Sequence, residues 1–227
     1  MMRFASLFSC RYSFSRTIIW LLRIFYITLP TQTIDVKTKP KEMKQDSMIL
    51  KQLSIGYHSK KQSRVLVSGM NASLQTGELT ALIGSNGAGK STLLRTLAGF
   101  QKPLSGEILL HDSSEIPVGR METKTRYCPL GQISLKDLAK KIAVVLTVAP
   151  ALTSVRAEEL VGMGRSPYTR FWGGLSSADK KIVDEAMRWV GIDNLKSRMF
   201  HTLSDGERQK VMIAKALAQQ TGIILLD

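Results

Sequence analysis

A glycine-rich stretch, GSNGAGKST, occupies residues 84 to 92 and fits the pattern G-x-x-x-x-G-K-[ST]. Glycines let the backbone curl so that successive N–H groups point inward, and a helix starting there adds a dipole that favours negative charge. Lys90 at the end of the stretch has the reach for β- and γ-phosphates, and the Ser91 hydroxyl suits Mg²⁺. The stretch therefore predicts a phosphate-binding loop. The alternative is a glycine-rich turn with a surface lysine.

The elements around this stretch are those that a phosphate-binding loop needs. ELTALIG, residues 78 to 84, has the composition of a short buried strand. The segment after the glycines predicts a helix, because its apolar residues recur at helical spacing: Leu93, Leu94, Leu97 and Ala98. A loop between a strand and a helix favours phosphate binding over an ordinary turn.

Two further stretches carry chemistry near the end of the chain. LSDGERQK, residues 203 to 210, opens a predicted helix, where Ser204 and Asp205 are candidate N-caps and the Ser-x-Gly turn is also suited to an anion. GIILLD follows 16 residues later and reads as a buried strand that delivers the carboxylate of Asp227. N-capping alone would explain the first stretch, but not the combination with the second.

With these three stretches the chain resembles the ATP-binding subunits of ABC transporters. GSNGAGKST is similar to their Walker A motif, LSDGE to their signature and IILLD to their Walker B motif, over residues 48 to 227. The resemblance implies ATP and Mg²⁺ as cofactors and ATP hydrolysis as the activity. It also implies that a general-base glutamate directly follows Asp227, so residues 1 to 227 alone are expected to hydrolyse ATP poorly.

Residue by residue, the resemblance implies a nucleotide site with Lys90 in a catalytic role and with Ser91 and Asp227 at the metal. Tyr57 matches the aromatic position that stacks on adenine, with a core tyrosine as the alternative. Ser204 and Gly206 would face the γ-phosphate of a nucleotide held by a second copy. The nucleotide-binding residues are thus Tyr57, Gly84, Ser85, Asn86, Gly87, Ala88, Gly89, Lys90, Ser91, Thr92, Ser204 and Gly206.

The predicted fold class is α/β: a P-loop NTPase of ABC type, with a mostly parallel sheet, an antiparallel β edge and an inserted helical subdomain. The ATPase domain is expected over residues 48 to 227 and its helical subdomain over about 149 to 212. Buried strands at both ends and helical periodicity between them predict this arrangement. Residues 140 to 147 read as a strand, and residues 113 to 134, with two prolines and no period, as a loop.

Residues 1 to 47 read as a leader and linker. Their apolar run, residues 17 to 29, follows several arginines but contains Arg23 and is shorter than the roughly 20 residues that span a bilayer. Three interpretations stay open: a translated upstream region before a start at Met43 or Met48, a leader that contacts a membrane, and a signal or anchor.

Composition narrows the class of protein without deciding it. The formal net charge of +14 fits a polyanionic ligand, a membrane surface or nucleic acid, and equally a merely basic protein. Cys10 and Cys128 lack the spacing of a disulfide framework or a zinc site, and the three histidines form no metal-binding pattern.

The segment GMGRSPYTRFWGG, residues 162 to 174, is similar to importers of iron–siderophore complexes, haem and cobalamin. The expected function is therefore to energise import of such a complex from the cytoplasmic face of the plasma membrane. Expected partners are a second copy paired head to tail, permease subunits and, indirectly, a substrate-binding protein, but no nucleic acid. The alternatives are a soluble ABC ATPase acting on nucleic acid and a non-hydrolysing nucleotide-binding module. In the family, a glutamine that contacts Mg²⁺ usually transmits motion to the permease. This sequence has Thr147 at about that position, so whether it transmits motion in the same way stays open.

Overall fold

The computed structural model describes residues 3–6, 45–58, 63–112, 126–146, 152–169 and 174–227. The largest sheet of this part of the chain has four antiparallel strands in the order β3-β2-β5-β6. These strands are β2 (Asp46–His58), β3 (Ser63–Gln75), β5 (Ser105–Asp112) and β6 (Arg126–Pro129). β2 and β3 follow each other closely along the chain, which favours antiparallel pairing of these two strands.

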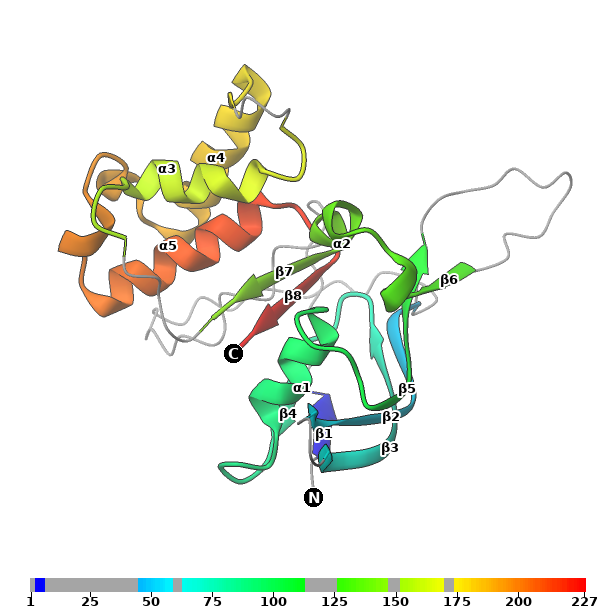
Figure 1. Cartoon of the computed structure of the whole chain (residues 1–227). Helices are drawn as coiled ribbons and strands as arrows, with labels where there is room; N and C mark the ends of the chain where they lie inside the picture. The colour runs from blue at the N-terminus through cyan, green and yellow to red at the C-terminus, as the bar shows by residue number, and fades with distance from the viewer. Residues whose placement is uncertain (1–2, 7–44, 59–62, 113–125, 147–151, 170–173) are drawn as a thin grey trace, which may run out of the picture.

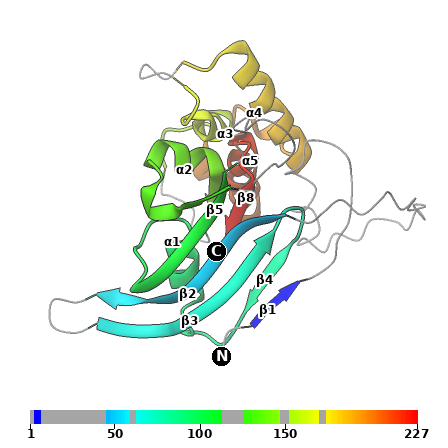
Figure 2. The ribbon, with the colours of Figure 1, turned by 90° about the vertical axis from the view of Figure 1, so that its right-hand side faces the viewer.

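Two smaller strand pairs complete the described sheets. β1 (Arg3–Ser6) pairs antiparallel with β4 (Thr80–Ile83), the strand before the glycine-rich loop, and the two lie side by side in Figure 2. β7 (Ile142–Val145) pairs in parallel with β8 (Ile223–Leu226). A parallel pair needs a long crossover. Here the crossover contains three α-helices.

The helices form two groups. α1 (Lys90–Leu97) and α2 (Leu135–Lys141) lie near the strands, whereas the three helices between β7 and β8 pack together on the other side of that strand pair (Figure 1). That second group consists of α3 (Ala157–Gly162), α4 (Ser177–Val190) and α5 (Asp205–Ala218). Short 3₁₀ turns link them: η3 (Met163–Arg165), η4 (Asp193–Leu195) and η5 (Phe200–Thr202).

The β7–β8 pair lies between two hydrophobic cores. Strand alternation sends successive side chains to opposite faces. Ala143 and Val145 of β7 therefore pack into the core of the helical group, while Ile142 and Leu225 pack into the core that joins α1 to the four-stranded sheet. Both cores meet at the strand pair that ends beside Asp227.

The structure confirms the α/β class, the antiparallel edge and the helices between β7 and β8, and it corrects two details. Parallel pairing was expected to dominate, but among the described strands it occurs only in β7–β8. The expected loop contains β6 at residues 126–129 and the turn η2 (Leu130–Gln132), and the first residues of the expected strand 140–147 belong to α2. A four-residue strand ending in Pro129 is too short to show alternation, and proline is tolerated there because β6 is an edge strand.

In the described part of the chain, every helix is too short or too polar to cross a membrane. The apolar run at residues 17–29 and the linker after it, up to residue 44, lie outside the described residues. Within the expected leader and linker, Arg3–Ser6 form β1, and β2 begins at Asp46.

Candidate functional site

The glycine-rich loop runs from the end of β4 to the start of α1, as its sequence predicts (Figure 1). Two of its glycines adopt left-handed backbone angles, with φ of 78° at Gly87 and 92° at Gly89. Side chains at such angles are strained, so glycine suits both positions. The amide of Ala88 donates to the carbonyl oxygen of Ser85 at 3.2 Å, which closes a tight turn in front of the helix.

The start of α1 is not capped by the protein itself. Gly89 occupies the N-cap position and provides no side-chain acceptor, and the first turn of the helix contains no acidic residue. The first amides of a helix lack intrahelical acceptors and lie at the positive end of its dipole. The chain therefore presents an electropositive helix end without an anion of its own.

Lys90 adds a full positive charge at this end. Its Nζ donates to the carbonyl oxygens of Gly84 and Ser85, both at 2.8 Å, which folds the side chain back over the loop. These are neutral acceptors, and a phosphate oxygen would bind the ammonium group more strongly. The geometry holds the cation ready for a phosphate.

The glycine-rich stretch and the GIILLD stretch come together where Ser91 contacts Asp227. The Ser91 hydroxyl donates to Oδ1 of Asp227 at 2.8 Å, although the residues are 136 positions apart. β8 positions the carboxylate, because the Asp227 amide continues the strand pairing by donating to the carbonyl oxygen of Val145 at 3.0 Å. A hydroxyl and a carboxylate are thus fixed together at the start of α1.

These two oxygen ligands fit the chemistry of Mg²⁺. Magnesium is usually held by one or two carboxylates and by the phosphates of the substrate, and it keeps several waters. In the described residues, no three side chains from among His, Cys, Asp and Glu gather into a fuller metal site. The donor set therefore suits a cation that arrives with a phosphate ligand better than a metal bound by protein alone.

A cleft of about 460 Å³ lies over the loop. Three residues of the β2–β3 hairpin line it, together with six from the loop and the start of α1: Tyr57, Arg64, Leu66, Asn86, Gly87, Gly89, Lys90, Ser91 and Thr92. The Tyr57 ring is 49% exposed, and its hydroxyl hydrogen-bonds to that of Thr92 at 2.8 Å. The cleft can therefore accommodate a phosphate chain at the glycine-rich end and a flat ring at the tyrosine.

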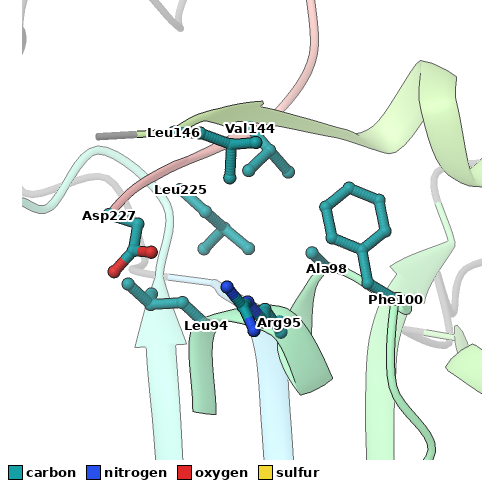
Figure 3. A pocket seen from close by; sticks show the side chains of 8 residues that line it. All are labelled: Leu94, Arg95, Ala98, Phe100, Val144, Leu146, Leu225 and Asp227. Atoms are coloured by element: carbon teal, nitrogen blue, oxygen red, sulfur yellow. The ribbon is translucent and has the colours of Figure 1, made fainter. Parts of the chain in front are cut away.

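A second hollow, between α1 and the β7–β8 pair, has different chemistry. Its lining is mostly apolar, with Asp227 near Leu94 and Phe100 farther along (Figure 3). Its volume is only about 10 Å³, the lower limit for a single water molecule. This hollow is a packing gap, whereas the cleft over the loop is large enough for a ligand.

Ser204 and Gly206 lie apart from the cleft, at the start of α5 in the helical group. Ser204 caps α5 in a reciprocal arrangement: its Oγ accepts from the Glu207 amide at 3.3 Å, and Glu207 Oε2 accepts from the Ser204 amide at 2.8 Å. The hydrogen bond from the Ser204 amide is the main reason that the Glu207 pKa lies below its usual value. A Cβ at Gly206 would meet open space.

The structure thus assembles Tyr57, the loop, Lys90, Ser91, Thr92 and Asp227, and it leaves Ser204 and Gly206 separate within one chain. Thr147 lies outside the described residues. Sequence reasoning missed Arg64, although its register opposite Tyr57 in the β2–β3 hairpin would follow from a correct pairing of the two predicted strands. It also missed the bond between Tyr57 and Thr92.

Comparisons with known proteins identify the family of the chain. Residues 67–227 match a family model described as ABC transporter. The chain is 40% identical over 175 residues to an uncharacterized ABC transporter ATP-binding protein of Methanocaldococcus jannaschii, covering 77% of this chain and 54% of that protein. It is 34% identical to the iron(3+)-hydroxamate import ATP-binding protein FhuC of Bacillus subtilis, covering 80% of this chain and 61% of FhuC.

A solved structure also resembles the chain. It is cbiO1 from Clostridium perfringens, part of the ABC transporter complex cbiONQ, with a TM-score of 0.59 and 27% identity over 80% of this chain and 65% of that one. The chain spans little more than half the length of the curated relatives.

Proposed function

Because the chain belongs to the ABC transporter family, we propose that it binds ATP with Mg²⁺ and, as part of the whole protein, hydrolyses ATP to energise import of an iron(III)–siderophore or related complex. The observation that carries the nucleotide site is the bond between Ser91 and Asp227. It brings the two proposed Mg²⁺ ligands together beside an uncapped helix start and a lysine.

In this proposal the loop amides and the start of α1 bind the β- and γ-phosphates, and Lys90 exchanges its bonds to loop carbonyls for bonds to phosphate oxygens. Ser91 and Asp227 hold Mg²⁺, which neutralises charge on the phosphates when it is bound. Tyr57 supplies the surface for adenine, and its bond to Thr92 orients the ring at the mouth of the cleft. Catalysis then depends on positioning and charge stabilisation more than on covalent chemistry.

The proposed partners follow from the position of Ser204 and Gly206. They lie outside the cleft in their own chain, so they reach a γ-phosphate only if a second copy pairs head to tail. The Ser204 hydroxyl also donates to Glu207 Oε2 at 2.9 Å, and this bond must be exchanged when a phosphate approaches. Permease subunits and a substrate-binding protein complete the proposed importer, with the ATPase at the cytoplasmic face of the membrane.

The cargo class rests on similarity. FhuC, whose name refers to import of iron(3+)-hydroxamate, aligns over 80% of this chain, and the GRSPY segment has the sequence expected of such importers. We therefore propose a chelated metal as the cargo.

The test is uptake into proteoliposomes that contain the full-length ATPase and its permease, with labelled iron–siderophore, ATP and Mg²⁺. We expect uptake that depends on ATP and stops with Lys90→Ala. ATP turnover that is raised by nucleic acid and indifferent to the permease would instead support the rival function on nucleic acid.

A further inference from the structure

Arg165, the arginine of the GRSPY segment, is a buried charge that the proposed chemistry does not use. It is only 6% exposed. Its Nε donates to Oδ1 of Asp179 at 2.9 Å, and its Nη1 donates to the carbonyl oxygen of Ala218 at 2.9 Å and to Oε1 of Gln220 at 3.0 Å. The Tyr168 ring covers the guanidinium at 4.1 Å. An ordinary surface arginine makes no such set of contacts.

These contacts join three elements. Arg165 ends η3, Asp179 lies in the first turn of α4, and Ala218 is the last residue of α5. Asp179 also accepts bonds from the amide and hydroxyl of Ser176, which cap α4. A cation at the last carbonyls of a helix is favourable. Removing one partner of a buried ion pair leaves an uncompensated charge, so loss of Arg165 should disturb the place where the three elements meet.

A close backbone approach fixes the same place. A Cβ at Gly164 would lie 2.3 Å from the carbonyl oxygen of Lys215, so η3 lies directly against the last turn of α5. Just beyond that turn, Gln219 Nε2 donates to the carbonyl oxygen of Ile142 at 3.0 Å, at the start of β7. The end of α5 is therefore anchored on one side to η3 and α4 and on the other to the strand pair that leads to Asp227.

The opposite end of α5 carries Ser204 and Gly206. The helix has 14 residues, which at 1.5 Å per residue makes it about 21 Å long. A tilt of about 10° at the anchored end would move the other end by about 4 Å, more than a hydrogen bond tolerates. The anchor thus sets the position of the signature residues.

We propose that Arg165 is a positioning residue that fixes the angle between α5 and the β7–β8 pair, and so holds Ser204 and Gly206 where a second copy's nucleotide can meet them. This inference rests on the proposed function, because it needs the head-to-tail pair. Arg165 is not part of the cleft that binds the nucleotide within its own chain. Its loss therefore impairs closure of the pair and turnover while it spares nucleotide binding.

The experiment compares Arg165→Met, which removes the charge and the hydrogen-bonding fork, with Arg165→Lys and with the wild-type full-length protein. Arg188→Met, at an exposed arginine of α4, is the matched control. Calorimetry gives the dissociation constant of Mg-ATP for one chain, and steady-state assays give the turnover number. Sedimentation gives the fraction of dimer formed with ATP.

We expect Arg165→Met to bind Mg-ATP within about twofold of the wild type but to turn over and dimerise about tenfold less well, in the range measured for residues that couple sites. Arg165→Lys recovers part of the loss, and Arg188→Met behaves as wild type. Wild-type turnover in Arg165→Met, or parallel losses of binding and turnover, would overturn the inference.

Asp179→Asn keeps the size of the side chain, removes the charge that faces Arg165 and replaces one of its two acceptor oxygens with an amide group. It weakens the same junction with less change in packing, so it reports the same split if Arg165→Met fails to fold. Wild-type turnover in a folded Asp179→Asn protein would also overturn the inference. Failure of the proposed function gives a different result, because the wild-type protein would then neither bind nor hydrolyse ATP.

Discussion

The starts of α1 and α5 were both predicted to face a phosphate, but they are opposite in chemistry. α1 follows the glycine-rich loop, whereas α5 has Gly206 within its own first turn. α1 has Gly89 at its N-cap, no side-chain cap and no acid in its first turn. α5 has Ser204 in reciprocal bonds with Glu207 and two acids in its first turn, Asp205 and Glu207.

This difference gives the two helix starts different roles: the start of α1 can bind a ligand within one chain, whereas the start of α5 is suited to contact a nucleotide that a second copy holds. At α5 the chain supplies its own anions near the positive helix end, and the Ser204 hydroxyl accepts from the Glu207 amide. At α1 the free amides and the positive helix end are left for a ligand, with Lys90 and the Ser91–Asp227 pair beside them. A single chain should therefore bind phosphate at α1, and α5 should take part only after a partner brings a nucleotide close.

The largest expected effect is at Lys90. Lys90→Ala should weaken binding of Mg-ATP by about 30- to 100-fold, since a charged hydrogen bond contributes about 1.5–3 kcal/mol and two phosphates lose their cation. Calorimetry measures the change, and Lys102→Ala, at an exposed lysine beyond α1, serves as the control. If Lys90→Ala and Lys102→Ala bound Mg-ATP with equal affinity, the start of α1 would not be the phosphate-binding site.

The carboxylate beside α1 comes next. Asp227→Asn keeps the shape of the side chain and removes its charge, so the gain in ATP affinity on adding Mg²⁺ should fall by about tenfold, or ~1.4 kcal/mol. Titrations with Mg²⁺ and with EDTA measure this gain. Glu185→Gln, on the exposed face of α4, should leave it unchanged. If Asp227→Asn kept the full gain, the metal would have to bind elsewhere.

Substitutions at Tyr57 test whether the cleft over α1 also contacts the adenine base. Tyr57→Leu should weaken ATP binding by about fivefold, near the low end of measured stacking energies because the ring is half exposed. Tyr57→Phe keeps the ring and loses only the bond to Thr92, so its affinity should stay within about twofold. Competition with inorganic triphosphate completes the measurement: a weaker binding of triphosphate in Tyr57→Leu would contradict a role at the base.

At α5 the expected effect is on stability. Ser204→Ala removes the cap and should lower the free energy of unfolding by about 1 kcal/mol, while Mg-ATP binding to one chain stays unchanged. Urea unfolding provides the measurement, with the exposed Ser197→Ala as control. If Ser204→Ala lowered the ATP affinity of a single chain, the start of α5 would also contribute to binding, and the proposed difference between the two helix starts would be wrong.

The smallest effect is the pH dependence of the α5 cap. The Glu207 pKa is lowered, first by the bond from the Ser204 amide, so the ionised form is the one that the fold favours. Its contribution to stability is fully present above the ordinary carboxyl value of about 4.3 and is lost as pH falls through the lowered value. The stability difference between wild type and Glu207→Gln should therefore shrink in acid. If this stability difference instead grew below pH 4, the shift of the Glu207 pKa would have the opposite sign.

Local patterns predicted the local structure well. The glycine-rich turn between a strand and a helix and the strand before Asp227 both follow from short stretches of sequence, and the structure has each of them. β6 was missed because four residues give too little periodicity, and the pairing of β4 with β1 has no local signal.

The long-range contacts could not be predicted from periodicity. The bond between Ser91 and Asp227 was expected only through the family resemblance. The segment with Arg165 was interpreted as a mark of the cargo, but its contacts with Asp179 and Ala218 depend on how three separate helical elements meet. Such contacts become visible only once the fold is known.

The central claim is that the start of α1 binds the phosphates of a nucleotide, and calorimetric titration of the wild-type chain with Mg-ATP tests it most directly. We predict saturable heat with one ATP per chain, and competition by inorganic triphosphate. Absence of binding heat at several temperatures, with a folded chain and Mg²⁺ present, would contradict the account.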